Sequence, residues 1–126
     1  MGLNFKSREQ LLWNPGMRVG RMFLAYVAAL EPLIEKGAGI SEVIRDDTYE
    51  VNGEETRRFA EVLLDWYIMT NSPVLRAMVE CVLRTCLVLA ERAGYPVELS
   101  SQNAPGGEER DAFQQKIASE RWPMAM

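Results

Sequence analysis

Residues 52–94, NGEETRRFAEVLLDWYIMTNSPVLRAMVECVLRTCLVLAERAG, contain the two clearest helix patterns of the chain. Along two segments, apolar residues recur at steps of three and four, which is the spacing of one face of an α-helix. Each segment begins with a helix signal, Asn52 as a capping residue and Ser72 as a capping residue before a proline. We predict two long antiparallel helices, about 53–70 and about 73–93.

The second of these helices has the more regular apolar stripe, and we expect that stripe to lie in the core. Its residues are Leu75, Met78, Val79, Val82, Cys86, Leu89, Ala90 and Ala93. The first helix is apolar over a wider arc, which is typical of a helix at the centre of a bundle or at an oligomer contact.

A third helix is predicted upstream, about 15–36. Pro15 follows Asn14, which is a favourable pair at a helix start. Pro32 removes a backbone hydrogen bond, so we predict one kinked helix or two abutting helices. Its apolar residues recur at helical steps and are expected to face the core. They are Val19, Met22, Phe23, Tyr26, Val27, Leu30, Leu33 and Ile34.

The remaining segments favour short helices, apart from residues 48–51, which we expect to form an extended piece. Residues 1–14 have the pattern of an arm with one helical turn, and residues 40–47 have that of a weak, short helix. No segment alternates between apolar and polar residues for long enough to predict a sheet. We therefore predict an all-α fold, a compact bundle of four to five helices.

The chain has 126 residues, which is the length of one domain. Residues 1–99 are expected to form the helical bundle with its N-terminal arm. Residues 100–107 have the composition of a linker, and residues 108–126 are expected to form a short helix and a tail.

Histidine is absent from the chain, and only two cysteines are present. The missing histidine excludes Ser-His and Cys-His nucleophile pairs and every histidine-ligated metal site. Two cysteines are too few for a disulfide scaffold or a four-cysteine zinc site. We expect no cofactor, and the leading hypothesis needs no metal.

The charge balance and the hydropathy pattern bear on partners and location. The net charge of −4 argues against a general nucleic-acid binder, whose affinity comes from a surplus of basic residues. The longest stretch without a charged residue, 66–75, has 10 residues, whereas a membrane span needs about 20. No basic-then-apolar signal opens the chain. We expect no contact with nucleic acid or membrane, and a location in the cytoplasm or in a virion or assembly made there.

Three carboxylates form the one pattern that favours an enzyme. Glu54, Glu61 and Asp65 share one face of a helix at steps of seven and four. Acid pairs at such spacing hold Mg²⁺ in all-helical nucleotide pyrophosphatases of the MazG type, whose pattern needs a second acid cluster that the following helix lacks. The alternative function is therefore a divalent-metal-dependent hydrolase, nucleotide pyrophosphatase-like. The simpler interpretation is a solvated face on which Glu54 pairs with Arg58.

Large apolar residues near both ends of the chain favour a different function. They either fold back to complete the core or contact a partner, at whose interface tryptophan and methionine are enriched. The candidate partner-binding residues are Phe5, Trp13, Phe113, Ile117, Trp122 and Met124. The leading hypothesis is a non-catalytic protein–protein interaction or assembly component: an oligomeric structural subunit, an adaptor or an inhibitor. It would bind a protein partner or itself as a homo-oligomer, and its size would suit a phage or mobile-element product.

Overall fold

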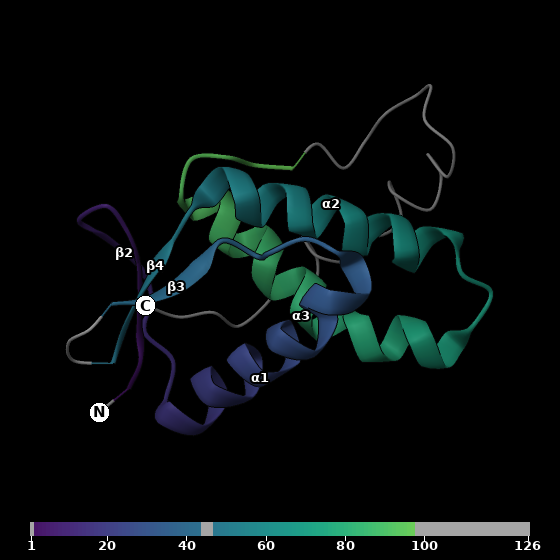
Figure 1. The fold of residues 1–126 in the computed structure, drawn as a ribbon, viewed down its shortest axis with the longest axis horizontal. Helices are drawn as coiled ribbons and strands as arrows, with labels where there is room; N and C mark the ends of the chain where they lie inside the picture. The colour runs from purple at the N-terminus through teal and green to yellow at the C-terminus, as the bar shows by residue number, and fades with distance from the viewer. Residues whose placement is uncertain (1, 44–46, 98–126) are drawn as a thin grey trace, which may run out of the picture.

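The computed structural model describes residues 2–43 and 47–97, and within them the chain has an α+β fold (Figure 1). A four-stranded mixed sheet accompanies three helices in these residues, so the prediction of an all-α bundle of four to five helices is wrong. The elements are β1 (Asn4–Ser7), β2 (Gln10–Trp13), α1 (Met17–Ile34), β3 (Ile40–Val43), β4 (Thr48–Val51), α2 (Gly53–Met69) and α3 (Pro73–Arg92).

The sheet has the strand order β2-β1-β4-β3. β1 pairs with β2 in an antiparallel hairpin, and β4 pairs with β3 in a second one. The two hairpins join through a parallel pairing of β1 with β4, in which Phe5 lies beside Tyr49. This central contact links residues more than 40 positions apart, so no local pattern in the sequence encodes it.

The strands correct two predictions, the helical turn within residues 1–14 and the short helix at residues 40–47. Each strand has only four residues, and an alternation that short does not stand out from chance. The turn between β1 and β2 also lacks the glycine or asparagine that usually marks a tight hairpin. Arg8 adopts the left-handed conformation there (φ 57°), and the Glu50 carboxylate accepts a hydrogen bond from its backbone N–H at 2.7 Å.

The two long helices agree with prediction to within one residue at each end. The Asn52 side chain accepts a hydrogen bond from the backbone N–H of Glu55 at 3.1 Å, and the Ser72 side chain accepts one from Leu75 at 3.2 Å. α2 and α3 lie side by side as an antiparallel hairpin (Figure 1). The sheet lies at the end where α2 begins and α3 ends, and the α2–α3 connection projects away from it.

α1 is shorter than the predicted helix 15–36. It starts after Asn14, whose side-chain amide donates to the Leu3 carbonyl at 3.0 Å and to the Asn4 side chain at 2.6 Å and so does not cap the helix. Pro32 lies in the last turn, and the helix ends at Glu35 in the left-handed conformation (φ 61°). The proline therefore marks the end of the helix and not a kink between two halves.

Phe5 lies at the centre of the core and is fully buried. Its ring stacks on Trp13 of β2 at 5.2 Å between centroids and on Tyr49 of β4 at 5.5 Å, and it meets the edge of Phe23 of α1 at 5.8 Å. Stacked and edge-to-face rings at these distances are favourable aromatic geometries. One side chain thus connects three other elements to the central strand.

Gly20 of α1 lies close to Leu3, the residue before β1. A Cβ atom at this position would lie 2.6 Å from the Leu3 Cδ1 atom, so only glycine permits the approach. At the edge of the sheet formed by β2, the Arg92 guanidinium of α3 donates to the Leu12 carbonyl at 2.8 Å. Within the described part of the chain, no helix combines the length and the hydropathy that crossing a membrane would require.

The aromatic cluster yields a stability prediction. We expect Phe5→Ala to lower the free energy of unfolding by about 3–5 kcal/mol, because it removes a fully buried ring and leaves a cavity among three others. Leu11→Ala, a truncation on the same hairpin at a side chain that is 38% exposed, should cost less than about 1 kcal/mol. Urea unfolding followed by circular dichroism measures both. Equal losses for the two variants would contradict the central role of Phe5.

Candidate functional site

The most unusual surface of the described chain is the solvent-facing side of α1. Only Gly20, Phe23 and Val27 of this helix are buried. Ten of its residues are exposed, and eight of these are apolar. We call these eight the outer face of α1: Val19, Met22, Ala25, Tyr26, Ala28, Ala29, Pro32 and Leu33.

The large side chains of the outer face are open to solvent to an unusual degree. Val19, Met22, Tyr26 and Leu33 are 55%, 50%, 45% and 66% exposed, respectively. A helix on the surface of a globular protein normally presents charged and polar residues to water. A contiguous apolar surface of this kind is typical of a site that binds another protein.

The charges of α1 are confined to its two ends. Arg18 and Arg21 are the two exposed residues of the helix that are not apolar, and both lie at its start. Glu31 and Glu35 lie at its end, and the Glu31 carboxylate accepts a hydrogen bond from the Ala38 backbone N–H at 2.9 Å. This is the reverse of the distribution that the helix dipole favours, which is acid at the start and base at the end.

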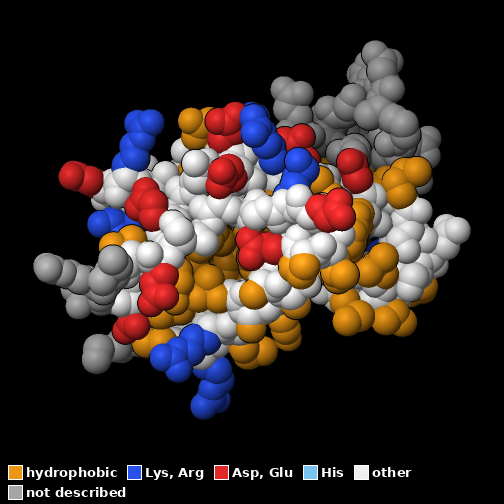
Figure 2. Space-filling view, viewed as in Figure 1, with side chains coloured by type: hydrophobic (Ala, Val, Ile, Leu, Met, Phe, Trp, Pro, Cys, Tyr) orange, Lys and Arg blue, Asp and Glu red, His pale blue; other side chains and the backbone are white. Residues whose placement is uncertain are grey.

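A second apolar patch lies where α2 and α3 project beyond the sheet. Met69, Val74 and Met78 are 66%, 66% and 71% exposed. Apolar side chains gather over α1 and over this tip of the α2–α3 hairpin (Figure 2). The prediction that Met78 lies in the core is therefore wrong: at this end of α3, Leu75 packs against the core, whereas Met78 points into solvent.

The residues proposed from the sequence as partner contacts fall into two groups. Phe5 and Trp13 are 0% and 6% exposed and belong to the aromatic cluster of the core. They complete the fold of their own chain, which was the other interpretation of the N-terminal segment. Four candidates and the proposed linker 100–107 lie outside the described residues, and they stay predictions. These candidates are Phe113, Ile117, Trp122 and Met124.

Sequence reasoning missed the outer face of α1 because it placed that pattern in the core. Helical periodicity shows which residues share a face but not whether the face points inward. Two features of the sequence carried the signal. The helix is apolar on nearly every side between its ends, and its charges oppose its own dipole.

The three carboxylates of the hydrolase hypothesis lie on the exposed side of α2. Glu54 pairs with Arg58 at 2.7 Å, as predicted for a solvated face, and Glu61 pairs with Arg57 at 3.3 Å. Asp65 is exposed as well. Within residues 2–43 and 47–97, no group of three histidine, cysteine, aspartate or glutamate side chains is arranged to hold a metal ion.

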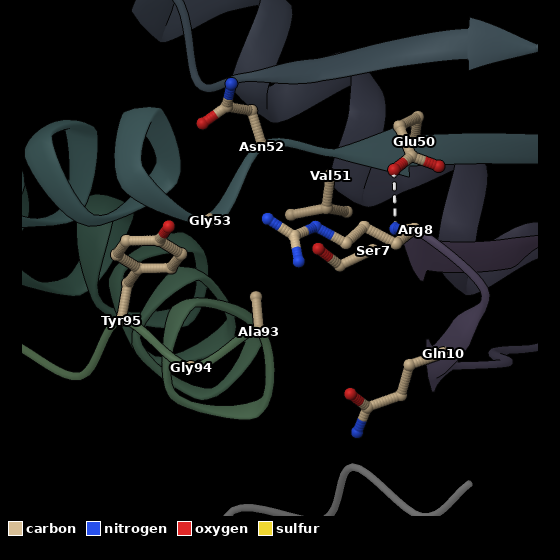
Figure 3. A pocket seen from close by; sticks show the side chains of 10 residues that line it. All are labelled: Ser7, Arg8, Gln10, Glu50, Val51, Asn52, Gly53, Ala93, Gly94 and Tyr95. Carbon is tan, nitrogen blue, oxygen red and sulfur yellow. Dashed lines mark hydrogen bonds between the residues drawn. The ribbon is translucent and has the colours of Figure 1, made fainter.

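A hollow of about 520 Å³ lies between the β1–β2 turn, the start of α2 and the end of α3 (Figure 3). The Arg8 side chain extends into it from the turn, and the ring of Tyr95 borders it on the opposite side (Figure 3). Glu50 is the one carboxylate among the lining residues, and it already holds the backbone of Arg8. Glu50 thus holds the hairpin turn in place, and we assign the hollow no reaction.

The two cysteines are free thiols in environments that disfavour nucleophilic chemistry. Complete burial raises the pKa of Cys86 far above its ordinary value. Partial burial, followed by the nearby Glu80 carboxylate, also raises the pKa of the exposed Cys81, although a backbone hydrogen bond opposes the shift. Since the thiolate is the reactive form, both side chains are poor nucleophiles at neutral pH.

These observations define a small α+β protein whose most distinctive surface is an apolar helix face. Comparison with known sequences shows that the chain belongs to DUF6086, a family of unknown function whose model matches residues 1–126. No curated protein and no solved structure matches the chain.

The exposure of Met78 leads to a prediction opposite to the one that its helical spacing suggests. Met78→Asp should cost at most about 1 kcal/mol, because the new carboxylate stays in water. Val79→Asp, one residue further along and 1% exposed, should unfold the protein by burying an unpaired charge. Thermal unfolding of the two variants measures the difference. A native-like melt for Val79→Asp, or an unfolded Met78→Asp, would show that the orientation of α3 is wrong.

The ion pair of Glu61 makes a second prediction. Glu61→Gln should change the free energy of unfolding by less than about 0.5 kcal/mol, because an exposed pair contributes little. The melting temperature of the unmodified protein should also be the same with and without millimolar MgCl₂. A rise with Mg²⁺ that Glu61→Gln abolishes would favour the hydrolase hypothesis, since a ligand that binds only the native state stabilises it.

Proposed function

We propose that this protein is a non-catalytic protein–protein interaction or assembly component that works through the outer face of α1. The observation that carries the proposal is the exposure of Val19, Met22, Tyr26 and Leu33, each at least 45% open to solvent on one helix. Leaving large apolar side chains in water forgoes the stabilisation that burial brings, roughly 25 cal/mol per Å². A partner that covers the face recovers this free energy.

The way in which α1 is attached suits a binding element. One side of the helix, on which Gly20, Phe23 and Val27 are buried, packs against the core and contacts α3, whereas α2 and α3 pack extensively along each other. The contacts around Phe23 fix its position, and most of its surface is left for another molecule. The function is thus proposed to reside in surface complementarity, with no bound cofactor.

We further propose that the protein acts in the cytoplasm. The support is the state of its thiols: Cys81 and Cys86 are both unpaired, and Cys81 is exposed. Unpaired thiols are typical of proteins that stay in a reducing compartment. The hydrolase alternative is not taken up, because two of its three carboxylates face arginines.

Site-specific photo-crosslinking in producing cells tests the proposal. A photoreactive amino acid replaces Met22 on the outer face, and in a control variant it replaces Glu61, which is exposed on α2. Irradiation should give a discrete covalent adduct from position 22 and none from position 61. An adduct to either another protein or a second copy of this chain supports an interaction function. No adduct from position 22, or equal adducts from both positions, would contradict it.

A further inference from the structure

The shape of the outer face indicates which kind of partner fits it. In its middle, Ala25 and Ala29 lie one turn apart on the same side of the helix, and Tyr26 and Ala28 flank them. The other large side chains, Val19, Met22 and Leu33, lie toward the ends of the helix. Small residues allow two helix axes to come close, because the distance between packed helices depends on the side chains at the contact. The face therefore suits another helix better than a loop or a sheet edge.

The charges at the ends of α1 restrict the charges that a partner helix can place beside each end. Arg18, Arg21 and Glu35 form no ion pair with any residue of the described ranges. Their arrangement costs α1 stability when it is alone, since the arginines lie near the positive end of the helix dipole and Glu35 near the negative end. A partner helix that presents acid beside the arginines and base beside Glu35 would offset this cost.

We infer that the partner is α1 of a second copy of this chain, packed antiparallel to the first. This inference rests on the proposed function and names its partner. An antiparallel arrangement places the basic start of each helix beside the acidic end of the other and aligns the two dipoles favourably. A parallel arrangement would place arginine beside arginine. Two identical faces related by a two-fold axis form a closed dimer, which is the commonest form of homo-oligomer.

The length of α1 limits the surface area that this contact can bury, and therefore the affinity of the dimer. With 18 residues, the helix is about 27 Å long. One helix-to-helix contact of that length buries less than the 1,200 Å² or so that stable interfaces typically reach. The dimer is therefore expected to dissociate on dilution, and its measurement requires a series of protein concentrations.

Reversing charges at the two ends of α1 tests the inference. Within one chain, Arg18 and Glu35 are 17 residues apart, or about 25 Å along the helix, so they cannot pair with each other. In an antiparallel dimer, Arg18 of one copy and Glu35 of the other copy lie at the same end of the contact. Arg18→Glu and Glu35→Arg should each weaken dimerisation about tenfold or more, because each change reverses two contacts per dimer. The double variant Arg18→Glu/Glu35→Arg should restore the dimer to within about threefold of the unmodified protein.

Each single change also improves the match of α1 with its own dipole, so each variant should melt at the same temperature as the parent at low concentration, or higher. Loss of dimer would then not be a consequence of unfolding. Sedimentation velocity on the full chain at several concentrations and two salt concentrations measures the association. The weakening caused by each single change should diminish at high salt, because exposed charges are screened.

A steric pair of variants complements the charge reversal. Ala25→Arg places a long cation in the middle of the outer face and should abolish the dimer. Ala77→Arg, the same change at an exposed alanine of α3, should leave it intact. A monomer at every concentration, or a dimer indifferent to Ala25→Arg, would overturn the inference. The inference would also be overturned if the double variant Arg18→Glu/Glu35→Arg dimerised as weakly as either single variant. If photo-crosslinking from position 22 captures only a different protein, the interaction function stands and self-association is rejected.

Discussion

The stacking of Phe5 on Trp13 and Tyr49, with Phe23 at its edge, is the interaction on which the rest of the fold depends. β1 is a strand of only four residues, and hydrogen bonds alone would hold it weakly in a sheet of such short strands. The ring of Phe5 adds apolar contact in three directions at once, to β2, to β4 and to α1. The parallel register of β1 with β4 and the position of α1 both follow from this one buried side chain.

The same interaction explains why α1 keeps an open side. Phe23 and Val27 turn toward the cluster, and Gly20 allows the helix to lie against Leu3. These contacts use one side of the helix, on which half-buried residues such as Leu24 and Leu30 also pack against the core, and the opposite side stays exposed. Because the core already sets the position of α1, its apolar outer face is a preformed surface, which reduces the entropy lost on binding. The exposure is thus consistent with selection for binding and not for the stability of the monomer.

The local signals in the sequence were sufficient for α2 and α3. Asn52, Ser72 and Pro73 act at the helix starts as their chemistry predicts, and long runs at helical spacing identify the segments. The sheet could not be predicted in the same way, because its strands are too short to show alternation and its central pairing joins β1 to a strand more than 40 residues away. For the site, periodicity placed Val19, Met22 and Tyr26 on one face but assigned that face to the core. Only the packing of Phe23 against Phe5 decides which side of α1 points inward.

Hydrogen–deuterium exchange of α1 as a function of protein concentration tests the central claim most directly. Local stability follows the packing of each element, so the amides of α1 should exchange faster than those of α2 and α3 in dilute protein. As the concentration rises and copies of the chain associate, exchange within residues 18–33 should slow, while exchange in α2 and α3 should stay the same. Exchange of α1 that does not depend on concentration, or that slows equally in all three helices, would contradict the account.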